Sequence, residues 1–245
     1  SPMFRAMVKH ILRGLSSAAV VTCDTNVVRD ALTAARLATP DRTVVVPIGV
    51  NHVFSSRSDA ATDAAAQAAA SVAASLTGRL IGPRATPDQA IELLHVGSTV
   101  ERKRIDTLLA TLAEVRQTLP SVRLLRVGGE LTPVQQRQAA DLAIADAIIT
   151  LPSVDDATLA ALYRRAALVL LPSAREGFGL PVIEAMACGT PVLVSDLPVL
   201  REVGGPAATF APVGDTGAWS STILRLLAER TEQPVRWAAR RQQGM

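Results

Sequence analysis

Short apolar runs that alternate with helical stretches constrain the fold of this chain most. Each run has the length and the uninterrupted apolar character of a buried strand. The runs lie at residues 18–23, 43–47, 91–97, 122–128, 147–151, 167–172, 191–195 and 208–212. Because helical stretches separate the later runs, the pattern predicts an α/β fold, a Rossmann-like parallel sheet with helices on both faces. Ligands of such sheets bind at the carboxyl ends of the strands.

Helical signals between the runs support this prediction. Thr132-Pro133 followed by Gln135 indicates a helix start with a capping box and a proline in the first turn. Apolar residues at helical spacing form two stripes, Ile105, Leu108, Leu109, Leu112 and Val115, and Leu159, Leu162, Tyr163 and Ala166. Both stripes are expected to pack against the sheet.

The alternation breaks at residues 55–90, which are rich in alanine, with strong helix propensity but little to bury. We therefore divide the chain into residues 1–54, an Ala-rich helical insertion or linker at 55–90, and the main unit at 91–245. Helical stretches run up to both ends of the chain, "SPMFRAMVKH" and "RWAARRQQGM", which indicates a fragment.

The composition excludes several classes of function. The net charge of +3 is mild and the arginines are scattered, so no nucleic-acid partner is expected. Aromatic residues make up only 3% of the chain, which leaves few surfaces for stacking bases. Cys23 and Cys188 have neither metal-ligand spacing nor the density of a disulfide scaffold, so we expect reduced thiols in a cytoplasmic protein. No apolar run approaches the roughly 20 residues of a membrane span.

Residues 173–196, "SAREGFGLPVIEAMACGTPVLVSD", carry the strongest candidate site. We predict that Glu176 lies in the loop after a strand. Glu184 is predicted in the first turn of the next helix, which begins near Pro181 and stops at Gly189. The amides between the two glutamates lead into a helix N-terminus, whose unsatisfied N–H groups suit an anion. Two carboxylates beside an anion site indicate a ligand that is part phosphate and part polyol.

A second candidate site lies at residues 95–106, "HVGSTVERKRID". A strand is predicted to end at Gly97, with Arg102 and Lys103 opening the next helix as a clamp for a diphosphate. The alternative is that "RKR" is only a solvated basic face. His95 lies on an apolar strand, and we expect it to be a core histidine with satisfied hydrogen bonds.

The motif of Glu176 and Glu184 has two other interpretations. It would also fit an ordinary strand-to-helix connection with surface glutamates. A site for an NAD-type dinucleotide is a further alternative, since Gly177 and Gly179 match the start of G-x-G-x-x-G. That match fails in detail, because Val182 replaces the third glycine and Glu176 would face a pyrophosphate. The sequence has no D-x-D and no His/Cys cluster, so neither a metal ion nor a cofactor is expected.

Residues 172–203, "PSAREGFGLPVIEAMACGTPVLVSDLPVLREV", closely resemble the signature of the retaining family-4 (group 1) glycosyltransferases, which have the GT-B fold. Two glutamates with seven residues between them are the hallmark of that family. Residues 44–54 resemble its interdomain segment, 93–109 its phosphate-binding strand–loop–helix, and 154–166 the helix before the signature. These blocks follow the family order from about residue 15 to the end.

The resemblance implies a role for each matching residue. Lys103 would hold the diphosphate of the donor with help from Arg102, Glu176 would contact sugar hydroxyls, and Glu184 would take the ribose hydroxyls. The other implied contacts are Gly97 at the phosphate loop, the Gly177, Phe178 and Gly179 backbone around the sugar, Leu180 near the phosphate, and Thr150 and Leu151 at the base pocket. Many members carry an arginine where this chain has Ser98, and Arg102 is expected to compensate.

The implied activity is metal-independent transfer of a sugar, with retention, from a nucleotide sugar such as a UDP- or GDP-sugar to a glycan, lipid or small-molecule acceptor. Residues 1–54 would be a remnant of the N-terminal acceptor domain, and 91–245 the nucleotide-sugar domain, truncated at its C-terminus. Because most of the acceptor half is missing, we expect the chain alone to be inactive. The alternative is a catalytically inactive nucleotide-sugar-binding or interaction module. Peripheral contact with the inner face of the membrane is an open alternative to a freely cytoplasmic protein.

Overall fold

The computed structural model describes residues 2–57, 63–64 and 91–244. The helices are α1 (Pro2–Ser17), α2 (Asn26–Ala34), α4 (Ile105–Thr118), α5 (Pro133–Asp141), α6 (Asp156–Arg165), α7 (Leu180–Ala187), α8 (Pro198–Gly204), α9 (Thr216–Glu232) and α10 (Pro234–Gln243). The strands are β1 (Val21–Cys23), β2 (Thr43–Val45), β3 (Glu92–Val96), β4 (Arg123–Val127), β5 (Ile148–Leu151), β6 (Leu168–Leu171), β7 (Val192–Ser195) and β8 (Thr209–Ala211). Every predicted apolar run contains a strand.

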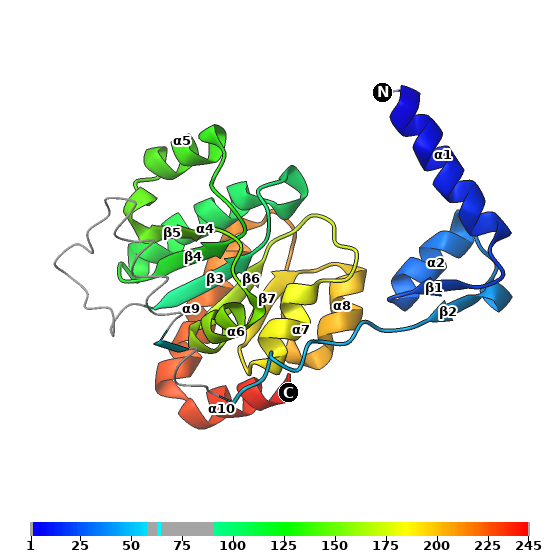
Figure 1. The fold of residues 1–245 in the computed structure, drawn as a ribbon. Coiled ribbons are helices and arrows are strands. Elements are labelled where there is room, and N and C mark those ends of the chain that lie inside the picture. The colour runs from blue at the N-terminus through cyan, green and yellow to red at the C-terminus, as the bar shows by residue number, and fades with distance from the viewer. Residues whose placement is uncertain (1, 58–62, 65–90, 245) are drawn as a thin grey trace.

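Strands β3 to β8 form one parallel sheet in the order β5-β4-β3-β6-β7-β8 (Figure 1). The strand order reverses between β3 and β6, because the chain first builds outward to β5 and then returns to the other side of β3. Such a reversal opens a crevice at the carboxyl ends of the two strands, where ligands of α/β sheets bind. Strands β1 and β2 form a separate parallel pair.

Helices cover both faces of the six-stranded sheet. Neighbouring residues of one strand enter different cores, since their side chains point to opposite faces. Leu93 packs in a cluster with residues of α4 and α9, whereas Leu94 packs in a cluster with residues of α6, α7 and α8. Leu109 and Leu162, one from each predicted helical stripe, lie buried on these opposite faces. The predicted α/β fold with a doubly covered parallel sheet is confirmed.

The start of α5 follows the sequence, but two other local predictions were wrong. The capping box of Thr132 and Gln135 is present. Arg102 and Lys103 lie in a short 3₁₀ helix, Glu101–Lys103, and do not open α4, because the left-handed backbone of Arg104 (φ 49°, ψ 49°) interrupts the helix there. Glu184 lies in the second turn of α7, not the first, since the helix already begins at Leu180.

Most of the predicted helical insertion at 55–90 lies outside the described residues. Residues 63 and 64 are helical, and Asp63 forms an ion pair with Arg164 of α6 at 2.8 Å. The division of the chain at residues 54 and 90 stays a prediction. Among the helices of the described ranges, none combines the length and the apolar character needed to cross a membrane.

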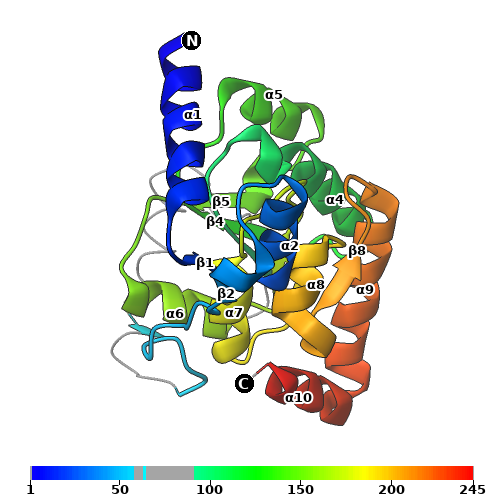
Figure 2. The same cartoon turned by 90° about the vertical axis from the view of Figure 1, so that its right-hand side faces the viewer.

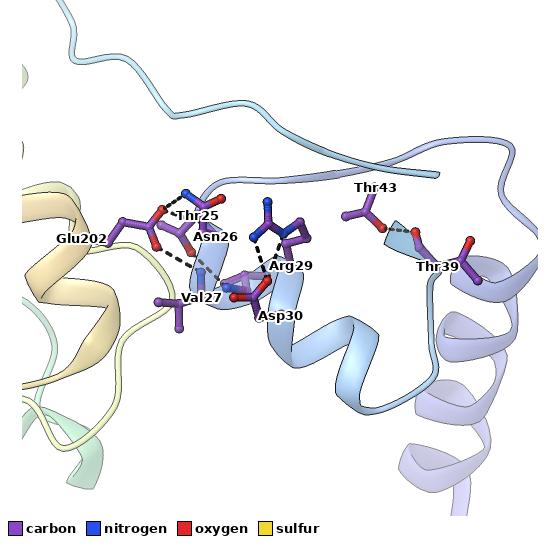
Figure 3. Close-up of polar contacts among 9 residues, drawn as sticks. Thr25, Asn26, Val27, Arg29, Asp30, Thr39, Thr43 and Glu202 are labelled. Atoms are coloured by element: carbon purple, nitrogen blue, oxygen red, sulfur yellow. Dashed lines mark hydrogen bonds and ion pairs between the residues drawn. The ribbon is translucent and has the colours of Figure 1, made fainter. Parts of the chain in front are cut away.

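The unit of α1, α2, β1 and β2 lies to one side of the large sheet, with α2 against α8 (Figures 1 and 2). Glu202 of α8 carries the polar contact (Figure 3). Its Oε1 accepts hydrogen bonds from Asn26 N at 2.7 Å and Asn26 Nδ2 at 2.6 Å, and its Oε2 accepts one from Val27 N at 3.0 Å. The Thr25 side chain accepts from Val28 N, so the two side chains together satisfy the first N–H groups of α2.

Candidate functional site

The turn between β6 and α7 has a backbone that requires glycine. Gly179, the N-cap of α7, has φ 99°, and a Cβ at this position would lie 2.8 Å from Leu200 Cδ2. Gly179 has no side chain to cap the helix, and Pro181 has no N–H. The Val182 N–H donates to Gly179 O at 2.8 Å, so the Leu180 N–H is the amide of the first turn that a ligand can reach. Gly177 is exposed, Phe178 is half-buried and Leu180 is exposed, so this turn is accessible from solvent.

Glu176 lies in the same turn and joins the two candidate sites. Its Oε1 accepts hydrogen bonds from Lys103 Nζ at 2.5 Å and from Ser173 Oγ at 2.6 Å. Its Oε2 lies 3.4 Å from Arg102 Nη1, which also donates to Arg175 O at 3.3 Å. Only 7% of the Glu176 side chain and 9% of the Lys103 side chain are exposed, whereas Arg102 is 49% exposed. The structure therefore brings these three charged side chains together at the carboxyl ends of β3 and β6.

This arrangement differs from a simple clamp, because the cations are engaged with the carboxylate. An ion pair that is removed from water in this way needs good geometry and further hydrogen bonds, which Ser173 supplies. A diphosphate that reached Lys103 would compete with Glu176 for the ammonium group. The carboxylate would then be released to accept hydrogen bonds from hydroxyl groups.

Glu184 projects from α7 and is held by Tyr163 of α6. The Tyr163 hydroxyl donates a 2.8 Å hydrogen bond to Glu184 Oε2, and no described residue donates to Oε1. Burial raises the pKa of Glu184. The hydrogen bond from Tyr163 acts in the opposite direction but is the smaller effect, so the pKa stays above its ordinary value. Tyr163 also packs edge-on against Phe54, with ring centroids 5.9 Å apart. One oxygen of Glu184 is thus fixed, and the other is free for a ligand.

Replacing Tyr163 with phenylalanine should raise the pKa of Glu184 further, since the hydrogen bond that favours the carboxylate is lost. If ionised Glu184 accepts from ribose hydroxyls, UDP affinity falls as the pH drops through this pKa. The fall should therefore begin at a higher pH in Tyr163→Phe than in the unchanged chain, as measured by calorimetric titrations from pH 8 down to about pH 5. Glu184→Gln is the control, because it should remove the contribution of Glu184 and leave only the pH dependence of the terminal phosphate of UDP, whose pKa is about 6. Identical pH profiles for Tyr163→Phe and the unchanged chain would contradict the role given to Glu184.

The loop after β3 is built around Gly97, which has φ 151°. A Cβ at Gly97 would lie 3.4 Å from both His95 Cε1 and Lys103 Cε, so the glycine lets Lys103 pass close to the strand end. His95 is fully buried, as predicted, but neither ring nitrogen has a hydrogen-bond partner in the described part of the chain. The prediction of satisfied hydrogen bonds was wrong, because Arg126, the neighbour of His95 on β4, directs its Nη donors to the carbonyls of Gly129 and Gly97 and not to the imidazole.

Thr150 and Leu151 lie on β5, at the edge of the sheet. Strands β4 and β3 separate β5 from β6, which places this edge about 14 Å from β6 at about 4.8 Å per strand. The Leu151 carbonyl accepts hydrogen bonds from Gly128 N at 3.2 Å and Gly129 N at 3.4 Å. The structure does not bring Thr150 and Leu151 into contact with the two glutamates, and their role at a base stays a prediction.

Three polar residues of the site were not predicted as functional. Tyr163 appeared only as a member of an apolar stripe, and Ser173 only as the first residue of the segment 173–196. Arg126 had one signal, the matching positions of "LLHVG" and "LLRVG", which put a polar residue two positions before the glycine of neighbouring strands. Such a residue in an apolar strand marks a place where a polar contact is needed.

The cysteines and the acidic residues give no sign of a metal centre in the described parts of the chain. No group of three or more His, Cys, Asp or Glu side chains in these parts is placed to hold a metal ion. Cys23 and Cys188 are both free and buried. Burial raises the pKa of Cys188 to about 11, so its thiol is protonated at neutral pH.

The family model described as "Glycosyl transferases group 1" matches residues 80–243, which is well over half of the chain. The D-inositol 3-phosphate glycosyltransferase of Segniliparus rotundus is 42% identical over 146 residues, which are 54% of this chain and 31% of that protein. The chain thus spans about a third of the length of this curated relative.

Solved structures show the same architecture. The sucrose-phosphate synthase of Thermosynechococcus elongatus has a TM-score of 0.72 and 26% identity, covering 99% of this chain and 55% of that one. Anabaena HepE in complex with UDP-glucose has a TM-score of 0.75 and 18% identity, covering 99% of this chain and 64% of that one. The sequence resemblance and the fold agree, and this chain belongs to the group 1 family of glycosyl transferases.

Proposed function

We propose that this chain is the nucleotide-sugar-binding half of a retaining glycosyltransferase that needs neither a metal ion nor a cofactor. The observation that carries the proposal is the cluster of Glu176, Lys103 and Arg102 at the strand-order reversal, with Glu184 on the helix that follows. HepE, which shares the fold, was solved with UDP and with UDP-glucose. This supports a UDP-sugar as the donor, with a GDP-sugar as the alternative.

Each group then has a task in the transfer. The diphosphate of the donor binds Lys103, Arg102 and the Leu180 amide at the start of α7, which neutralise the negative charge that develops as the anomeric bond breaks. Glu176, released from Lys103, accepts hydrogen bonds from sugar hydroxyls, and Glu184 accepts from the ribose. Stabilisation of the leaving group is the main contribution to catalysis. The acceptor, a glycan, lipid or small molecule, attacks from the face that the diphosphate vacates, which gives retention.

A second candidate is a binding or interaction module without transfer activity. It is favoured by the ion pairs of Glu176 with Lys103 and Arg102, since a diphosphate would have to displace them in order to bind. In both candidates the partner of the chain is an N-terminal acceptor domain. We propose a cytoplasmic location, where thiols stay reduced, because Cys23 and Cys188 are both free.

Calorimetric titration with UDP-glucose and GDP-mannose tests the proposed function. We expect heat of binding with at least one of these donors, and the absence of heat with both, together with none from UDP or GDP, would rule it out. A transfer assay on the chain combined with an N-terminal acceptor domain, using a donor that binds, separates the two candidates. We expect turnover from the combination and none from the chain alone, and a combination without turnover would favour the binding module.

Arg102→Ala is expected to weaken UDP or GDP binding about tenfold, because one charge-assisted hydrogen bond to the diphosphate is worth roughly 1.5 kcal/mol. Arg104→Ala is the matched control, since Arg104 donates to Asp106 at 2.9 Å and lies outside the Glu176 cluster. Its affinity should stay close to that of the unchanged chain. Equal, small losses for both variants would mean that "RKR" is only a solvated basic face.

A further inference from the structure

Arg126 of β4 is a buried cation without an acidic partner. Its side chain is fully buried and is one of the largest such side chains in the described core. Nη1 donates to Gly129 O at 3.2 Å and Nη2 to Gly97 O at 3.1 Å, while Nε has no partner. Because a guanidinium cannot be deprotonated in a protein, its burial without a counter-charge is costly and calls for a reason.

The two carbonyls that Arg126 holds belong to the loops at the carboxyl ends of β3 and β4. A Cβ on Gly128 would lie 2.6 Å from Gly97 O, so these two loops are packed backbone to backbone. The Gly97 loop is also the one that lies against the stem of Lys103. Arg126 therefore sits directly beneath the loop that packs against Lys103, the residue to which the proposed function assigns the diphosphate.

The hydrogen bond to Gly97 also sets the direction of the next peptide group. In a trans peptide the C=O and the N–H point in opposite directions. With Gly97 O turned inward to Arg126, the N–H of Ser98 is turned outward, and Ser98 is exposed. The Gly97–Ser98 loop thus points the N–H of Ser98 outward, above the buried guanidinium of Arg126.

Within the described ranges, no other group balances the charge of Arg126. His95 lies opposite Arg126 on β3, and its pKa is lowered to about 3 by burial and by the positive charges of Arg126 and Lys103, so it is neutral. The exposed Glu130 favours the charged form of Arg126 but forms no ion pair with it. The carboxylate of Glu176 is already engaged with Lys103 and Arg102. A ligand with a negative charge would balance the positive charge of Arg126.

We propose that Arg126 is a positioning residue for the diphosphate of the nucleotide donor. It supplies buried positive charge beneath the Gly97–Ser98 loop and turns the Ser98 N–H toward the phosphate. The proposal rests on the proposed function and adds to it a residue on a neighbouring strand.

The test compares UDP with uridine, and GDP with guanosine, by calorimetric titration of the unchanged chain, Arg126→Met and Arg126→Lys. Arg126→Met should weaken binding of the diphosphate about tenfold or more and leave the nucleoside unchanged, because only the diphosphate interacts with the buried charge. Arg126→Lys keeps the charge and should recover most of the affinity. A purely structural role would weaken the nucleoside and the diphosphate alike.

The outcomes separate the two proposals. If the unchanged chain binds neither UDP nor GDP, the proposed function fails and this inference fails with it. If the chain binds UDP or GDP and Arg126→Met binds it equally well, only the inference is overturned. Thermal unfolding of each variant checks that it is folded. Should Arg126→Met not fold, Arg126→Gln, which keeps donors for the carbonyls but no charge, takes its place with the same expectation.

Discussion

Replacing Lys103 with methionine is expected to weaken UDP or GDP binding about a hundredfold, since a charge-assisted hydrogen bond to the diphosphate is worth up to about 3 kcal/mol. The same substitution should lower the free energy of unfolding by about 3–5 kcal/mol, the usual cost of leaving one member of a buried ion pair without its partner. Methionine retains the apolar stem that packs beside Gly97. Calorimetric titration and urea denaturation measure the two effects.

The double variant Lys103→Met, Glu176→Gln distinguishes the two effects. Stability should largely return, because no unpaired carboxylate remains buried beside Ser173. Affinity for UDP or GDP should stay low, because the ammonium group is still missing. If affinity returned together with stability, Lys103 would hold the fold and not the diphosphate.

Replacing Glu176 alone with glutamine is expected to change the affinities for UDP and UDP-glucose in different ways. UDP should bind about tenfold more tightly, because the diphosphate no longer competes with a carboxylate for Lys103. UDP-glucose should gain much less, since the contact between Glu176 and the sugar hydroxyls is weakened by the same change. Calorimetric titrations with both ligands, or with GDP and GDP-mannose, give the ratio of the two affinities.

Glu101→Gln provides the matched control for that experiment. Glu101 lies on the same 3₁₀ helix as Lys103 and is exposed, so its removal changes the net charge equally without touching the ion pair. Its effect on UDP should be small and should fade with added salt. A loss of affinity for both UDP and UDP-glucose in Glu176→Gln would show that Glu176 does not compete for Lys103.

The fold could be predicted because its signals are local. An apolar run such as residues 167–172 and a stripe such as Leu108, Leu109 and Leu112 carry the strand and helix periods within a few residues. The capping box of Thr132 and Gln135 is likewise read from four consecutive positions. The interruption of the helix at Arg104 could not be predicted in this way. It depends on the left-handed backbone of Arg104, whose side chain donates to Asp106, and an arginine gives no local sequence signal for that conformation.

The candidate site could be predicted only in part, because its contacts connect distant segments. The sequence predicted that Glu176 and Lys103 each follow the end of a strand. It did not predict that Lys103 Nζ lies 2.5 Å from Glu176 Oε1. The pairing of Tyr163 with Glu184 depends on how α6 packs on α7. The pairing of His95 with Arg126 depends on the register of β3 and β4, and a single strand gives no register.

The contact of Glu202 with the start of α2 connects the two parts of the described chain (Figure 3). One carboxylate receives all three hydrogen bonds from Asn26 and Val27, so a small rotation of α2 would strain them together. Leu200, on the same short helix as Glu202, lies against Gly179 at the start of α7. A displacement of α8 together with α2 would therefore also move Leu200 relative to the glycine turn at the start of α7.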